Sequence, residues 1–160
     1  MTGRRIAATF AAGLLASCGQ PQPEPNYVQQ LMKDVVQPNA DIYWHSAGSI
    51  VDAEGTHELT PTTDAGWQKA ADAAARIGEA GKTLMTEKYS KGRADDWKRF
   101  SQGMIEIAEK ARQAAADHSE DKVFEVGGTM YDVCSACHQA YPPPVPEDTG
   151  ENTDPYPDNG

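Results

Sequence analysis

The chain has 160 residues, a formal net charge of −10 at pH 7 and 39% hydrophobic residues. This length fits one domain with appendages and is long enough for one hydrophobic core. The acidity argues against binding to nucleic acids or to anionic membrane surfaces, because phosphate contacts need clustered Lys and Arg. Three cysteines cannot form a closed disulfide framework, and the composition excludes a protein with several membrane spans.

The N-terminal segment has the layout of an export signal. Arg4 and Arg5 precede an apolar run over residues 6–15, which is too short to span a bilayer as a stable helix. The sequence LASC that ends in Cys18 resembles the lipobox of bacterial lipoproteins. The resemblance implies that residues 1–17 are a signal peptide and that Cys18 then carries lipid. An ordinary signal peptide that is cut elsewhere is the alternative.

The next segments divide into a tether and four helices. Residues 18–26 contain three prolines and are expected to form the tether. Apolar residues at helical spacing then predict a first helix over residues 27–53, kinked near Pro38, followed by a loop over residues 52–63.

Three further helices follow along the chain. A second helix is predicted to start at an N-cap among Thr62, Thr63 and Asp64 and to end within residues 89–94. A third covers residues 97–115, and a fourth begins at the N-cap Ser119 and stops at a run of prolines.

Four amphipathic helices with short links predict an all-α, antiparallel up-down four-helix bundle over residues 27–141. No segment has the alternation that is typical of a strand. The last nineteen residues, 142–160, contain five acidic residues and no basic residue, and they are predicted to be disordered.

The strongest functional signal is the sequence Cys134-Ser135-Ala136-Cys137-His138, a C-x-x-C-H motif. Residues three apart lie on one face of a helix, so two thiols at this spacing can add to the two vinyl groups of one haem. The next residue, His138, then presents an imidazole to the iron. The motif therefore predicts one covalently attached haem c.

Three other chemistries fit parts of this motif. A C-x-x-C pair can be a dithiol redox site, although that site usually opens a helix after a strand. It can be half of a zinc site, although the chain has no second Cys pair. It can also be a structural disulfide, which the geometry of residues three apart on a helix disfavours.

A four-helix bundle with this motif near the end of its last helix resembles cytochrome c prime and its low-spin relatives, the class II c-type cytochromes. The matching stretches are FEVGGTMYDVCSACHQAY (residues 124–141) and VQQLMK (residues 28–33). The chain departs from the pattern at Pro142, where many members of the family have a basic residue. The resemblance allows a homodimer.

An up-down bundle brings the start of helix one, the end of helix two, the start of helix three and the end of helix four to one level. Residues expected at the level of the haem are Met32, Met85, Trp97 and His138. The low-spin relatives bind iron through a methionine in helix one, so the resemblance implies Met32 as a distal iron ligand. Packing of Met32 against a five-coordinate haem is the alternative.

Other polar and aromatic residues are assigned no ligand role. His45, His57 and His118 are expected away from the iron, and Trp44 and Trp67 are expected in the plain core. Side chains that have the charge to pair a haem propionate are Lys33, Arg93 and Arg99.

The sequence thus predicts a monohaem c-type cytochrome that transfers single electrons to a redox protein partner. We expect it to face the periplasm, to be held to a bacterial membrane by lipid alone, and not to be an enzyme. A five-coordinate haem protein that binds or sequesters small diatomic gases is the runner-up, followed by a peroxidase-like enzyme.

Overall fold

The structure, a computed structural model, describes residues 26–143. The predicted signal peptide, most of the predicted tether, the predicted lipidation site Cys18 and the acidic tail beyond Pro143 lie outside the described residues. Within residues 26–143, no helix combines the length and the apolar character that a membrane span requires.

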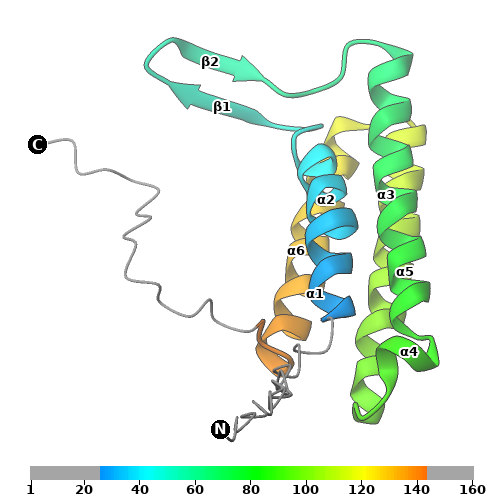
Figure 1. Cartoon of the computed structure of the whole chain (residues 1–160). Helices are drawn as coiled ribbons and strands as arrows, with labels where there is room; N and C mark the ends of the chain where they lie inside the picture. The colour runs from blue at the N-terminus through cyan, green and yellow to red at the C-terminus, as the bar shows by residue number, and fades with distance from the viewer. Residues whose placement is uncertain (1–25, 144–160) are drawn as a thin grey trace, which may run out of the picture.

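The described part of the chain is mostly helical, in agreement with the all-α prediction at that level (Figure 1). The helical elements are α1 (Tyr27–Leu31), η1 (Met32–Val36), α2 (Gln37–Trp44), α3 (Asp64–Leu84), α4 (Glu87–Ser90), α5 (Asp95–Ala116) and α6 (Glu120–Ala140). Two short strands, β1 (Ser49–Asp52) and β2 (Gly55–Glu58), lie between α2 and α3.

Local sequence explains where the long helices begin. The Thr63 hydroxyl accepts a 3.1 Å hydrogen bond from the Gly66 amide and so caps α3, as predicted. Ser119 occupies the N-cap position of α6, but its side chain makes no capping hydrogen bond. The first turn of α6 has Glu120 and Asp121, which the helix dipole favours at that end.

The first helical segment contains a wide turn next to Pro38. Residues 32–36 form a π-helical turn, in which the Gln37 amide donates to the carbonyl oxygen of Met32, five residues before it. The Asn39 side chain donates a 2.6 Å hydrogen bond to the carbonyl oxygen of Val35. Proline has no amide hydrogen, and these two bonds satisfy carbonyl groups in the turn before it. Helix therefore continues through Pro38 to Trp44.

The prediction that this first helix reaches residue 53 is wrong, because it ends at Trp44. Gly48 follows with a φ of +80°, a left-handed conformation that suits glycine and ends the helical path. The strands β1 and β2 then form an antiparallel hairpin with Val51 opposite Thr56.

The predicted loop over residues 52–63 is accordingly wrong over its first half, which contains the turn and the second strand of the hairpin. The Asp52 carboxylate accepts hydrogen bonds from the amides of Glu54 (3.0 Å) and Gly55 (3.1 Å) and closes the turn. In Figure 1 the hairpin extends away from the helices.

The second predicted helix also ends earlier than expected. α3 stops at Leu84, and the separate short helix α4 occupies part of the link to α5. α5 and α6 are joined by a much shorter link, in which His118 has a φ of 53° and reverses the chain.

Small side chains let the long helices pack closely. α3 and α5 lie side by side, and both helices have buried alanines, among them Ala70, Ala74, Ala108 and Ala111. A Cβ atom on Gly81 would lie 2.8 Å from Ile105 Cγ1 and 3.1 Å from the Ser101 carbonyl oxygen. The close approach of α3 and α5 at this position therefore depends on glycine.

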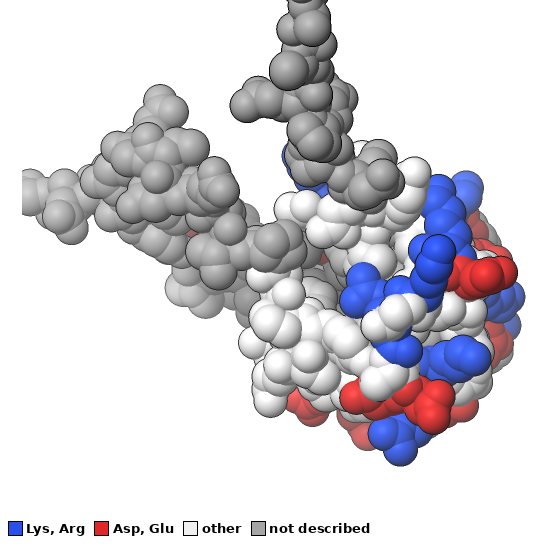
Figure 2. Space-filling view, turned by 60° about the horizontal axis from the view of Figure 1, so that its bottom comes forward, with Lys and Arg blue, Asp and Glu red and all other residues white. Residues whose placement is uncertain are grey.

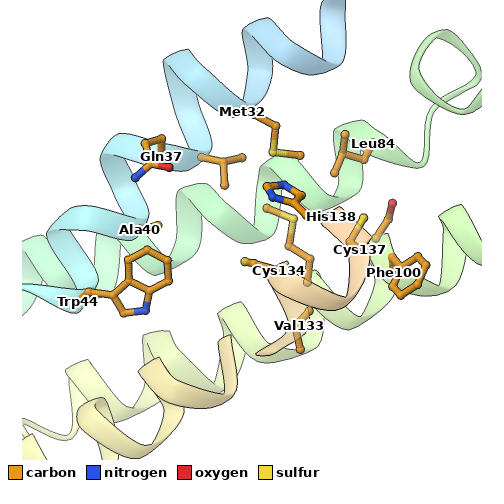
Figure 3. A pocket seen from close by; sticks show the side chains of 13 residues that line it. Met32, Gln37, Ala40, Trp44, Leu84, Phe100, Val133, Cys134, Cys137 and His138 are labelled. Carbon is orange, nitrogen blue, oxygen red and sulfur yellow. The ribbon is translucent and has the colours of Figure 1, made fainter. Parts of the chain in front are cut away.

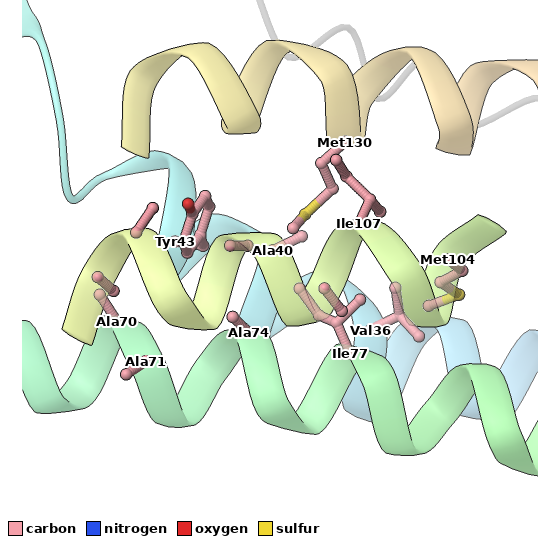
Figure 4. Close-up of a cluster of buried hydrophobic side chains, with 14 of the residues drawn as sticks. Val36, Ala40, Tyr43, Ala70, Ala71, Ala74, Ile77, Met104, Ile107 and Met130 are labelled. Atoms are coloured by element: carbon pink, nitrogen blue, oxygen red, sulfur yellow. The ribbon is translucent and has the colours of Figure 1, made fainter. Parts of the chain in front are cut away.

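The larger core side chains fill the space between these helices and the neighbouring α2 and α6 (Figure 4). Tyr43, Ile77, Val123 and Met130 are the largest fully buried ones. The same packing brings the start of α1, the end of α3, the start of α5 and the end of α6 to one end of the molecule (Figure 1). We refer to this as the motif end, because the C-x-x-C-H sequence lies there.

Candidate functional site

The C-x-x-C-H sequence lies in the last two turns of α6. Cys134 and Cys137 are both free thiols and are half-buried. α6 ends at Ala140, and the amide of Tyr141 donates a 2.8 Å hydrogen bond to the Cys137 carbonyl oxygen. Pro142 and the prolines after it cannot continue the helix, so the motif stays within the last two turns of α6.

Both cysteines, His138 and Met32 line a single cavity of about 90 Å³. Figure 3 shows Met32, from η1, and His138, from α6, extending into this space from opposite sides, with the two cysteines beside the imidazole. The remaining wall is largely apolar and consists of Val36, Gln37, Ala40, Trp44, Leu84, Phe100, Ser101, Met104 and Val133.

A second cavity of about 330 Å³ adjoins the first at the surface of the motif end. Met32, Cys137 and His138 line both cavities, and Trp97 and Tyr141 line only the second. The three shared side chains therefore stand between the two spaces.

The structure brings together three of the four residues that were expected at the level of the haem, and it places Met85 elsewhere. Met32 and His138 share the cavity, and Trp97 lies next to it in the second cavity. Met85 lines neither cavity, and 36% of its surface is exposed. It therefore has no place among the residues that face His138.

The three other histidines lie away from the site. His57 is in the hairpin and makes a 2.9 Å contact with Asp52, and the His118 ring stacks on Trp67 at a centroid distance of 5.2 Å. His45 Nδ1 lies 2.7 Å from the carbonyl oxygen of Asp41.

Sequence reasoning missed most of the lining residues, and three of them are instructive. Trp44 was expected in the plain core, but it lines the cavity while its indole nitrogen donates a 3.1 Å hydrogen bond to the Gly127 carbonyl oxygen. Phe100 and Met104 are four residues apart on the apolar face of α5 that begins with Trp97. Their spacing identified the apolar face of α5. Because Trp97 on the same face was expected beside the motif, this spacing was the signal that Phe100 and Met104 also lie near it.

Aromatic and charged side chains support the open side of the site. Trp97 is buried, and the Arg93 guanidinium lies over its ring at 4.0 Å. The Tyr141 ring meets Trp97 edge-on at 5.0 Å, and its hydroxyl donates to the Asp96 carboxylate. That hydrogen bond raises the pKa of the Tyr141 hydroxyl. The end of α6 is thereby fixed against the start of α5.

The environment of the two thiols keeps them protonated at neutral pH. Burial raises the pKa of Cys134, and burial together with the neighbouring Cys134 raises the pKa of Cys137. They also lie at the C-terminal end of α6, where the helix dipole disfavours a thiolate. A dithiol redox site needs the opposite, a thiol with a lowered pKa at a helix N-terminus.

The zinc alternative finds no support in the residues that the structure describes. Within residues 26–143, no three His, Cys, Asp or Glu side chains gather in a geometry that could hold a metal ion by themselves. Haem differs from such a site because the porphyrin supplies four of the iron ligands.

The donor set therefore fits a c-type haem better than it fits the other chemistries. Two free thiols on one helix face, the adjacent imidazole and a thioether from another helix line one mainly apolar space. Comparison with protein-family models, with curated proteins and with solved structures gave no match to this chain.

Proposed function

We propose that this protein is a monohaem c-type cytochrome that transfers single electrons. The observation that carries the proposal is the shared cavity of Cys134, Cys137, His138 and Met32. These are the side chains that covalent attachment and axial ligation of one haem require.

Different residues of the chain have different roles at this site. Cys134 and Cys137 would hold the haem through thioether bonds, and His138 and Met32 would bind its iron. The apolar side chains of Val36 and Leu84 would exclude water. When bound, haem supplies a one-electron redox couple at its iron, whose potential a His/Met ligand pair raises.

The proposed architecture is an antiparallel up-down four-helix bundle of the cytochrome c prime kind. The continuous segment from α1 to α2 would be its first helix, and α3, α5 and α6 the other three. The link from α5 to α6 is short, and neighbouring helices run in opposite directions (Figure 1). The LASC sequence before residue 19 supports export and a lipid anchor on Cys18, and the cytochrome would then face the periplasm from a membrane.

A second candidate function is the binding of small diatomic gases by a five-coordinate haem. The mainly apolar wall of the cavity, which includes Phe100 and Met104, favours it, because apolar side chains would surround most of an open coordination position. The two functions differ in whether Met32 binds the iron or only packs beside it.

Covalent haem is tested by expressing the chain with a c-type maturation system and staining a denaturing gel for haem. We expect a stained band at the mass of the chain. Replacing both Cys134 and Cys137 with Ser should abolish the stain. Ser135→Ala, between the two cysteines, is the matched control and should keep it. A colourless wild-type band would overturn the proposal.

A further inference from the structure

Positive charge is concentrated in one stretch of this acidic chain. Residues 82–99 contain six Lys and Arg against three Asp and Glu, whereas the other described residues contain six against fifteen. The six basic residues, called the basic patch below, are Lys82, Lys88, Lys91, Arg93, Lys98 and Arg99. Figure 2, which looks at the motif end, shows blue side chains gathered on this face with red ones beside them.

The basic patch borders the candidate haem site. It spans the last turn of α3, α4 and the first turns of α5. Leu84 and Phe100, which line the smaller cavity, come from this same stretch of chain. Arg93 itself lines the second cavity together with Cys137 and His138. The patch therefore surrounds the side of the site that is nearest to the surface.

Much of this charge is available to a partner. Lys91, Lys98 and Arg99 are exposed, and within residues 26–143 no carboxylate lies at ion-pair distance from them. Lys82 pairs only with Glu79 of its own helix at 2.6 Å, an exposed contact that contributes little to stability. These charges therefore contribute little to the stability of the fold.

We propose that the basic patch is the docking surface for a redox protein whose own redox centre is surrounded by Asp and Glu. This inference rests on the proposed function. On a chain with a net charge of −10, a local positive field at one end orients an acidic partner so that this end meets it first. One electron then leaves the reduced centre of one protein and enters the oxidised centre of the other, with no bond made or broken.

The local field can be measured with small oxidants of opposite charge on the reduced haem protein. Hexacyanoferrate(III) is the anionic probe and tris(phenanthroline)cobalt(III) the cationic one. The test variant combines Lys91→Glu with Lys98→Glu. The matched control combines Lys69→Glu with Lys110→Glu, two exposed lysines near the start of α3 and the end of α5, at the opposite end of the molecule.

At an ionic strength of about 0.1 M we expect the test variant to react about tenfold more slowly with hexacyanoferrate(III) and faster with the cobalt complex. The control has the same net charge and should change either rate by less than about twofold, because its charges lie well beyond the roughly 10 Å over which salt screens. A polyglutamate peptide, standing in for an acidic partner surface, should bind the wild type and the control but not the test variant.

Equal effects in the two variants would overturn the docking surface while leaving the cytochrome in place. A chain without haem would overturn both this inference and the proposed function, so the two failures are distinguishable. A third variant ends at Pro143 and lacks the acidic residues beyond it. If peptide binding appears only in this variant, the chain's own C-terminal segment occupies the patch and the partner proposal is wrong.

Discussion

The indole nitrogen of Trp97 donates a 2.8 Å hydrogen bond to the main-chain carbonyl oxygen of Leu84. This bond is buried, and it joins the first turn of α5 to the last residue of α3 across the link that contains α4. Leu84 lines one cavity of the candidate site and Trp97 the other. The bond therefore sets the position of two walls of the site at once.

Replacing Trp97 with Phe should lower the free energy of unfolding by about 1–3 kcal/mol, because a buried carbonyl group loses its donor. Denaturant unfolding of both proteins under the same conditions measures the difference. Tyr27→Phe, at a ring with 38% of its surface exposed, is the control and should change stability by less than about 0.5 kcal/mol. If Trp97→Phe behaves like this control, the bond does not hold the two helices together.

Removing the Met32 thioether should change the spectrum of the oxidised haem protein. We expect low-spin bands and a methionine-to-iron charge-transfer band in the wild type, and their loss in Met32→Ala, with a lower reduction potential. Met85→Ala is the control, because Met85 lines neither cavity of the site. A wild-type spectrum that is already high-spin, with ready carbon monoxide binding, would instead favour the gas-binding function.

Two glycines of α3 should respond oppositely to alanine. Gly81→Ala should lower the free energy of unfolding by about 1–2 kcal/mol, since overpacking at the contact with α5 outweighs the gain in helix propensity. At Gly78 a Cβ atom would meet only Ala108 Cβ, at 3.4 Å. Gly78→Ala should therefore be neutral or stabilise by up to about 1 kcal/mol. Equal unfolding midpoints for the two variants would contradict the packing account.

Cys18 should carry lipid in the mature protein, and Cys18→Ser should release the chain from membranes or block its processing. Mass spectrometry of the mature N-terminus tests this directly. The haem spectrum of any processed Cys18→Ser protein should equal that of the wild type, because the predicted tether separates Cys18 from the helices. A mature chain that begins at another residue would show that the lipobox resemblance is misleading.

Most of the correct predictions about the fold came from helical periodicity in the sequence. It identified the apolar faces of α3, α5 and α6, and chain reversal at short links then placed Met32 level with His138. Met85 occupied the same level in the sequence pattern, but the structure leaves it exposed. Position along a helix is readable from a sequence, whereas rotation about the helix axis depends on how its neighbours pack.

The hairpin was missed because Ala47 and Ile50 continued the helical spacing of the residues before them. The signals against helix were local: a glycine at residue 48 and the Asp52–Gly55 turn before a β-branched residue. Each of these signals is weak by itself. Only the backbone of the structure shows that together they end the helix and form a hairpin. Trp44 was assigned to the plain core for a related reason, since a tryptophan can pack in the core and still face a cavity.

The wide turn at residues 32–36 makes the spacing of the first helical segment part of the site. A π-helical turn accommodates one more residue than an α-helical turn does. Shortening this stretch by one residue would restore an α-helical turn and rotate everything before it by about 100° relative to α2. Val28 and the Met32 thioether would then leave the cavity that they line together with His138, even though both residues were still present. The distance in sequence from Met32 to Ala40 would thus matter to the proposed iron coordination as much as the identity of residue 32.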